Sequence, residues 1–338
     1  MATMQPFTIS LPESRTLTGL LSFPPPASHP TKGVPLIVTV HGGSYDASYY
    51  DADAAHSITR TSVPLSIPVI SITRPGYRDS TPLPKLKKGE SFMYQQGEFL
   101  HKVVLPALWE KYAKQANATG VVLHSHSIGA GIATITAAAH GQDSQPGYPL
   151  VGLVTSGIGA QLYDEPAHNA SAGEEKDENL RKIDSYRAGD EGEVPTITWP
   201  VDLKDELMLR KSWHLCHPTV FAASARLNNP SPIPEPADIR TTYHDRWRAE
   251  YAPHVKCPLL YGLAEYDNFW VNTTEAVEQY AGAFTASPRV ERGIVPKAPH
   301  CIELSCQGPG WLARTLGFAM ECATADALER EDAGLSKG

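Results

Sequence analysis

The sequence predicts an α/β protein in which a doubly wound, mainly parallel sheet carries a helical cap insertion. Three observations lead to this prediction. Short β-branched apolar runs alternate with helical patterns in the first and last parts of the chain, which is typical of parallel strands joined by helices. One run, at 121–123, turns directly into a small-residue helical pattern at Ser127. Between 159 and 254 the alternation stops, which indicates an insertion.

Composition narrows the class of function. The 338 residues include 41% hydrophobic residues and carry a formal net charge of −8, so we expect a sizeable core and no nucleic-acid partner. No run approaches 18 apolar residues, and the first 15 residues lack the apolar stretch of a signal peptide. The five cysteines show no metal-type spacing. We therefore expect a cytoplasmic protein without a membrane span, a metal or an organic cofactor.

The first part of the core spans residues 1–158. A Pro-Glu-Ser turn separates two short strands, and later apolar runs predict strands buried on both faces. A helix is expected from about 92 to 114, with a kink or break at Pro106, and another from the turn at Ser127 to about 140. The expected strands cover 7–11, 17–23, 34–40, 67–72, 121–123 and 150–155.

The insertion spans residues 159–254. Its charged stretch at 164–193 is typical of a solvated face rather than a metal site. Two helices are expected beyond it, at 201–221 and 239–251. We interpret this block as a cap or lid over the edge of the sheet. Its aromatic side chains either line a substrate pocket or pack in the core, and the candidates for the pocket are Trp213, Tyr243 and Trp247.

The second part of the core spans residues 255–322. A buried strand at 257–263 ends in Ala-Glu-Tyr-Asp-Asn, and a loop with the sequence Pro-His-Cys-Ile-Glu begins at residue 299. A polar tail, 323–338, follows and is expected to fray. The remaining expected elements are a helix at 270–280, a short strand at 289–295 and a final helix at 310–320.

The turn around Ser127 has the features of a nucleophile elbow. A serine at a sharp strand-to-helix corner adopts a strained backbone, so its neighbours two positions away must be small. Gly129 meets this requirement, and Ser125 meets it as a small residue where glycine is usual. The N-terminus of the following helix directs N–H groups to the space beside the serine oxygen, where an oxyanion would form. The alternative is a Ser/Gly-rich turn without chemistry.

A second turn, His41-Gly42-Gly43-Ser44, ends the strand at 34–40. Glycines at the carboxyl end of a strand let backbone N–H groups approach a ligand. This turn is either the source of a second oxyanion donor or an ordinary loop. We expect His41 to order the turn rather than act as a base, and Arg74 to fix the turn after the next strand through hydrogen bonds.

Serine, acid and histidine, each just after a core strand, follow the chain order of the α/β-hydrolase triad, and the sequence resembles that superfamily. His41-Gly42-Gly43 is similar to its oxyanion turn, and residues 74–80, Arg-Pro-Gly-Tyr-Arg-Asp-Ser, to its turn after the next strand. Residues 125–129 match its elbow and residues 299–303 its histidine loop. The resemblance covers about 7–160 and 255–320, and it implies an α/β-hydrolase fold with the insertion as its cap.

The resemblance implies a role for each residue. Ser127 would attack an acyl carbonyl, His300 would act as base and then acid, and the N–H of Ile128 with that of Gly43 or Ser44 would hold the oxyanion. Two residues are candidates for the acid of the triad. Counting nine residues from the strand's proline gives Asp267, which we prefer, whereas counting from the strand-end glycine gives Glu265.

Two departures from the superfamily pattern are Ser125 and Arg78, each where glycine is usual. Ser127 favours acyl chemistry, because epoxide and haloalkane hydrolases of this fold have aspartate at that position. His126 either contacts substrate or packs the elbow.

We therefore expect a serine hydrolase that cleaves an ester, lactone or thioester of a moderately large, apolar small molecule through an acyl-enzyme. The alternatives are acyl transfer, cyclisation or lyase chemistry, and a ligand-binding protein on the same fold. Composition is compatible with a fungal accessory enzyme of natural-product (secondary) metabolism. The sequence leaves the oligomeric state open, a homodimer included.

Overall fold

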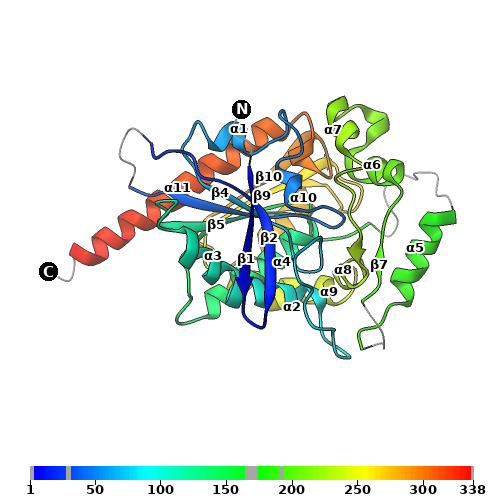
Figure 1. Ribbon diagram of the computed structural model, residues 1–338, viewed down its shortest axis with the longest axis horizontal. Coiled ribbons are helices and arrows are strands. Elements are labelled where there is room, and N and C mark those ends of the chain that lie inside the picture. The colour runs from blue at the N-terminus through cyan, green and yellow to red at the C-terminus, as the bar shows by residue number, and fades with distance from the viewer. Residues whose placement is uncertain (1–3, 28–31, 164–173, 190–193, 336–338) are drawn as a thin grey trace.

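A computed structural model describes residues 4–27, 32–163, 174–189 and 194–335. One eight-stranded sheet runs through the centre of the molecule, with helices on both of its faces (Figure 1). The strand order is β1-β2-β4-β3-β5-β6-β9-β10. The strands are β1 (Gln5–Leu11), β2 (Arg15–Ser22), β3 (Pro35–Val40), β4 (Val69–Ile72), β5 (Gly120–His126), β6 (Leu150–Ser156), β9 (Leu259–Tyr266) and β10 (Val290–Pro299).

The sheet is mainly parallel, as the sequence predicts. β1 pairs with β2 and β2 with β4 in antiparallel fashion. All later neighbours in the strand order of this sheet, from β4 to β10, are parallel. Every residue of β3, β5 and β6 is buried, because helices cover both faces. The carboxyl ends of β5 and β9 therefore meet at one edge of the sheet, the edge that carries Ser127 and Asp267.

Two groups of helices cover the sheet. Residues of α2, α3, α4 and α10 join one apolar cluster, and residues of α11 join the cluster on the opposite face. The expected helix at 92–114 is a helical run with a π-helical turn, Leu100–Val104, just before Pro106. The core helices are α1 (Thr59–Ser62), α2 (Phe92–Phe99), α3 (Leu105–Tyr112), α4 (Ile128–Gln142), α10 (Thr274–Ala281) and α11 (Gly308–Leu335).

The described residues between β6 and β9 add no strand to the eight-stranded sheet. They form short helices and a two-stranded ribbon, which lie at the right in Figure 1. The expected helix at 201–221 is wrong as a single element, because left-handed backbone at Arg210 and His214 ends it early. The expected helix at 239–251 is present from residue 242 onward, as an α-helical stretch that continues into a π-helical turn, Trp247–Tyr251. The elements are α5 (Glu174–Ser185), β7 (Thr196–Ile197), α6 (Val201–Leu209), α7 (Pro218–Ala223), β8 (Ser231–Pro232), α8 (Pro234–Ile239) and α9 (Thr242–Arg246).

Two segments named in the sequence analysis lie partly outside the described residues. The charged stretch at 164–193 lies partly outside them, and its described part includes α5. The expectation that the tail at 323–338 frays is wrong for its described part, since α11 continues to Leu335, and residues 336–338 lie outside the described residues. Cys322 and Ala323 are buried, and an ion pair between Arg330 and Asp326, one turn apart at 2.9 Å, supports the later turns.

The surroundings of two glycines, Gly129 at the elbow and Gly317 in α11, predict opposite effects of their replacement by alanine. A Cβ at Gly129 would lie 2.4 Å from the carbonyl oxygen of His41, whereas a Cβ at Gly317 meets nothing within 4 Å. We expect Gly129→Ala to destabilise the fold by about 1–3 kcal/mol or more. Gly317→Ala, within α11, should stabilise it by up to about 1 kcal/mol. Thermal denaturation measures both, and equal stability of the two variants would contradict this packing.

Candidate active site

Ser127 occupies a strained corner between β5 and α4. Its backbone has φ 55° and ψ −127°, in a region that residues other than glycine rarely adopt. The surrounding sheet holds this conformation, because the N–H of Ser127 donates to the carbonyl of Ser156 on β6 at 2.8 Å. The corner therefore presents the serine hydroxyl beyond the edge of the sheet.

Close packing explains why small residues flank the serine. A Cβ at Gly42 would lie 2.9 Å from the Cβ of Ser127, so the turn after β3 approaches the corner closely. Ser125, where the superfamily usually has glycine, fits because it is buried and its hydroxyl donates to the carbonyl of Val154 at 2.8 Å. This departure is accommodated without loss of a hydrogen bond.

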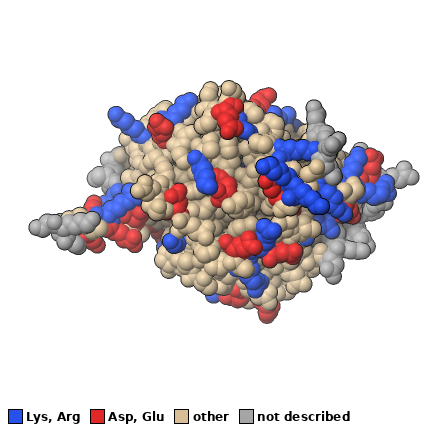
Figure 2. Space-filling view, turned by 90° about the horizontal axis from the view of Figure 1, so that it is seen from below, with Lys and Arg blue, Asp and Glu red and all other residues tan. Residues whose placement is uncertain are grey.

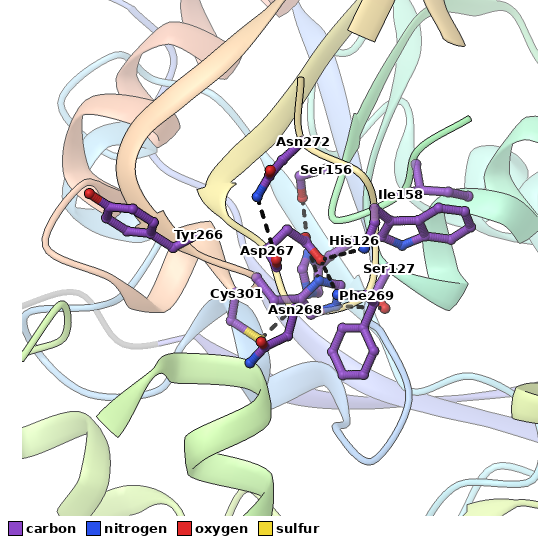
Figure 3. A network of polar contacts seen from close by, with 12 residues as sticks. His126, Ser127, Ser156, Ile158, Tyr266, Asp267, Asn268, Phe269, Asn272 and Cys301 are labelled. Atoms are coloured by element: carbon purple, nitrogen blue, oxygen red, sulfur yellow. Dashed lines mark hydrogen bonds and ion pairs between the residues drawn. The ribbon is translucent and has the colours of Figure 1, made fainter. Parts of the chain in front are cut away.

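The structure brings Ser127, His300 and Asp267 into one chain of hydrogen bonds. His300 Nε2 lies 3.0 Å from Ser127 Oγ, and His300 Nδ1 lies 2.7 Å from Asp267 Oδ2. Both His300 and Asp267 are 1% exposed. In Figure 3, dashed lines connect Ser127 and Asp267 through this network. A neutral His300 that donates from Nδ1 leaves Nε2 free to take the serine proton.

The structure distinguishes between Asp267 and Glu265, the two candidates for the triad acid that the sequence left open. Asp267 accepts the N–H groups of Phe269 and Trp270 through Oδ1 at 2.8 and 3.1 Å, which orients Oδ2 toward His300. Glu265 instead accepts the N–H of Lys297 at 2.6 Å, on the strand β10. The structure therefore places Asp267 beside the histidine and Glu265 away from it.

The candidates for the oxyanion donors line the same cavity as Ser127. Ile128 is the first residue of α4, so its N–H has no acceptor within the helix. Gly43 and Ser44 both line the cavity in front of the serine. Ser44 donates its N–H to the hydroxyl of Tyr77 at 3.2 Å. Gly43 therefore fits the second donor better than Ser44.

A buried polar cluster lies behind the elbow and includes His126. The imidazole of His126 stacks on Tyr49 with ring centroids 4.9 Å apart, and its Nδ1 lies 3.0 Å from Ser156 Oγ. Burial lowers the pKa of His126 to about 3, so the ring is neutral at pH 7. It does not line the cavity. The structure supports the packing role of His126 and not substrate contact.

Glu303 is the centre of this cluster, and sequence reasoning missed its role. Its carboxylate accepts hydrogen bonds from Tyr49 and Ser156, both at 2.7 Å, and from the indole N–H of Trp311 at 3.0 Å. Burial alone would raise the pKa of Glu303, but the facing histidines and these donors hold it well below its ordinary value. The signal was an acid three residues after His300 in an otherwise apolar loop.

A cavity of about 430 Å³ opens in front of Ser127 and His300. The expected pocket residues do not line it. Trp213 is 43% exposed and packs on Tyr266, while Tyr243 and Trp247 are buried in the core. Large apolar side chains from other positions form much of the wall: Leu162, Leu180, Ile183, Trp199, Leu207, Met208, Ile239, Phe269 and Trp270.

A buried ion pair joins the insertion to the glycine turn. Arg74 Nη1 lies 2.7 Å from Glu235 Oε1 at the start of α8, and neither side chain is more than 1% exposed. Arg74 also donates to the carbonyls of His41 and Gly42 at 2.9 and 3.2 Å. Glu235 accepts the hydroxyl of Tyr77 at 2.8 Å. The insertion thus fixes the turn that carries Gly43.

His41 orders this turn, as expected from the sequence. Its Nδ1 lies 2.7 Å from the carbonyl oxygen of Gly42, and its Nε2 accepts the N–H of Arg74 at 3.0 Å.

Arg78, the second departure from the superfamily pattern, has φ 47°, and its side chain extends to Asp46, with the two charged groups 3.0 Å apart.

Within the described ranges, no group of three or more His, Cys, Asp or Glu residues could hold a metal ion. In the same part of the chain, no helix combines the length and apolar character that crossing a bilayer requires.

Comparison with known proteins identifies relatives of the whole fold. A family model described as "Alpha/beta hydrolase family" matches residues 37–314. No curated protein sequence matches the chain. Among solved structures, the fold is similar to a soluble variant of monoglyceride lipase from Saccharomyces cerevisiae. That likeness has a TM-score of 0.64 at 12% identity, and it covers 96% of this chain and 97% of that one.

Two further structures show the same fold. A thermophilic esterase from Thermogutta terrifontis has a TM-score of 0.57 at 16% identity, with coverage of 94% of this chain and 99% of that one. A thioesterase domain from the curacin biosynthetic pathway has a TM-score of 0.53 at 12% identity, with coverage of 93% and 100%. At these identities the likeness concerns the fold alone.

The buried ion pair predicts a large effect of one charge removal. Glu235→Gln leaves the Arg74 guanidinium buried without a counter-charge, and we expect a loss of about 3 kcal/mol in the free energy of unfolding. Glu278→Gln is the matched control, because the pair of Glu278 with Arg292 is about half exposed and solvent screens it, so its loss should change stability far less. Urea denaturation measures both. Similar losses in the two variants would contradict this account.

Proposed function

The chain belongs to the alpha/beta hydrolase family, and on this premise we propose that it is a serine hydrolase that cleaves an ester, lactone or thioester through an acyl-enzyme on Ser127. One observation carries the proposal. Ser127 Oγ lies 3.0 Å from His300 Nε2, whose other ring nitrogen lies 2.7 Å from Asp267, at the wall of an apolar cavity. A serine becomes nucleophilic when an oriented imidazole can take its proton.

Each group has a role in the proposed reaction. Ser127 Oγ attacks the acyl carbonyl while His300 takes its proton, and Asp267 stabilises the imidazolium that forms. The N–H groups of Ile128 and Gly43 hold the oxyanion of the tetrahedral intermediate. His300 then protonates the leaving alkoxide or thiolate. In the second half-reaction His300 activates water, which attacks the acyl-enzyme and releases the acid.

The size and lining of the cavity support a substrate whose acyl or alcohol portion is moderately large and apolar. Its volume of about 430 Å³ and its apolar wall suit a small molecule rather than a polymer. Structures with this fold include enzymes described as a monoglyceride lipase, an esterase and a thioesterase. These descriptions support acyl chemistry and leave the leaving group open.

Acyl transfer is the second candidate, and the wall of the cavity favours it. Trp199 and Leu207 of the insertion line the cavity together with Ser127, so the acyl-enzyme is partly shielded from bulk water. Product analysis distinguishes the two reactions. Free acid as the main product in water containing methanol supports hydrolysis, and methyl ester as the main product supports transfer.

The nucleophile predicts the outcome of one substitution. Ser127→Ala should lower kcat/KM for p-nitrophenyl esters at least about 1,000-fold, because the acyl-enzyme cannot form. Measurement across acyl chain lengths with the wild-type protein locates the optimum set by the cavity. Equal activity of the folded variant and the wild type would overturn the assignment of Ser127.

The assignment of Asp267 as the acid predicts that substitutions of Asp267 and of its neighbour Glu265 change kcat to very different extents. Asp267→Asn should lower kcat by up to about 10,000-fold, because the amide no longer holds the required tautomer of His300. Glu265→Gln is the control, since Glu265 binds the backbone of Lys297, and its kcat should stay within about threefold of the wild type. Steady-state kinetics of the same ester measure both. The reverse pattern would make Glu265 the acid.

A further inference from the structure

Lys204 on α6 is a buried cation in the wall of the catalytic cavity. It is 1% exposed, and its ammonium has no hydrogen-bond acceptor in the part of the chain that the structure describes. The nitrogen lies 4.4 Å from the centroid of the Tyr45 ring. A ring face attracts a cation but accepts none of its three N–H bonds in the way an oxygen does.

The nearby acids are bonded to other groups. Asp205 accepts a hydrogen bond from the hydroxyl of Ser224. Asp46 accepts the N–H of Ser48 at 2.8 Å and also binds Arg78 at 3.0 Å. No carboxylate of the described residues lies within ion-pair distance of the Lys204 ammonium. A buried charge without a partner is unfavourable, and none of the described residues supplies an anion to this ammonium. An anion carried by a ligand would therefore be stabilised there.

A second unpartnered atom lies in the same cavity wall. The side-chain N of Asn268 donates to the carbonyl of Leu207 on α6 at 2.9 Å, which fixes the amide, while its Oδ1 is buried without a donor. Asn268, Lys204, Ser127 and His300 all line the cavity. Figure 3 shows Asn268 on the chain segment that follows Asp267, beside the network. The free atom of Asn268 is an acceptor, so it cannot bind an anion, whereas two cationic side chains, Lys204 and Arg240, line this otherwise largely apolar cavity.

We propose that Lys204 binds a carboxylate carried by the substrate, so that the protein acts on esters or thioesters whose acyl portion ends in an acid group. This inference rests on the proposed function, because it names the substrate class of the same site. A carboxylate is the anion that fits, since it accepts several of the ammonium's N–H bonds. The apolar wall contacts the carbon chain between the carboxylate and the scissile bond.

Kinetics of matched esters tests the proposal. The substrates are 4-nitrophenyl half-esters of dicarboxylic acids with four to ten carbons, each compared with the neutral 4-nitrophenyl ester of similar length. We expect kcat/KM of the wild type to favour the half-ester at one chain length. Lys204→Met should lower that preference, expressed as the ratio of kcat/KM for the half-ester to kcat/KM for the neutral ester, at least about tenfold. Lys204→Arg, which keeps the charge, should retain part of the preference.

A matched control removes a lysine outside the cavity. Lys211 is 42% exposed and pairs with Asp202 at 2.8 Å, so Lys211→Met removes the same charge without touching the proposed subsite. Its ratio of half-ester to neutral ester should equal that of the wild type. A similar fall in both variants would assign the preference to net charge and overturn the proposal.

Binding without turnover separates this proposal from the proposed function. In the Ser127→Ala background, isothermal titration with the favoured half-ester should give a Kd at least about tenfold weaker when Lys204→Met is added. Unchanged binding, or equal loss of half-ester and neutral-ester activity in Lys204→Met, overturns the carboxylate subsite while Ser127-dependent hydrolysis still stands. Strong Lys204-dependent binding without hydrolysis of any ester overturns the proposed function instead.

The pH dependence gives a further readout. Burial lowers the pKa of Lys204 to about 8, so its charge is lost as the pH rises through 8. Among the groups around it, burial raises the pKa of Tyr45 and raises that of Cys301 to about 12, which leaves both neutral. Burial also raises the pKa of Asp205, and Asp46 is the second acid near the ammonium. The preference for the half-ester should therefore fall above pH 8. A constant ratio from pH 7 to 9.5 would contradict the role of Lys204.

Discussion

The backbone of Ser127 is the constraint on which the site depends. With φ 55° and ψ −127°, it turns the chain from β5 into α4 within one residue. The serine hydroxyl then projects toward His300, and the first N–H of α4 points to the same space. This corner exists only because glycines at 42 and 129 let the turn after β3 pack against it. A side chain at either glycine would push the two turns apart and separate the nucleophile from the oxyanion donor.

The second structural link joins the catalytic edge to the insertion. Glu235 belongs to the insertion, yet its carboxylate binds Arg74 and Tyr77 of the core. Arg74 in turn holds the carbonyls of the glycine turn. Removing charges from water is unfavourable, so the pair is retained only with its full set of hydrogen bonds. The insertion therefore supplies both a wall of the cavity and a support for the turn that carries Gly43.

Much of the core could be predicted from the sequence. Apolar runs identify β3, β5 and β6 because these strands are buried on both faces, and the elbow residues follow from their spacing. His300 could be predicted because it follows a core strand at a position that the family resemblance indicates. Local pattern and chain order are enough for such residues. The resemblance left two candidates for the acid, Asp267 and Glu265, and only the structure shows which of them lies beside His300.

The insertion could not be predicted in the same way. Periodicity shows that Tyr243 and Trp247 are buried, but it does not tell which surface buries them, and they pack in the core rather than in the cavity. Glu235 and Lys204 acquire their roles from partners or cavities formed by distant segments. Short helices broken by left-handed residues such as Arg210 also carry no regular pattern. These features depend on tertiary packing, which a single sequence does not display.

The most direct test of the central claim is to label the folded protein with a fluorophosphonate probe and locate the adduct by peptide mass spectrometry. An activated serine displaces fluoride from the probe, whereas an ordinary hydroxyl does not react. The account predicts one adduct, on Ser127, that is lost when the protein is unfolded before labelling. An adduct on another residue, or no adduct in the folded protein, would contradict the claim that His300 and Asp267 activate Ser127.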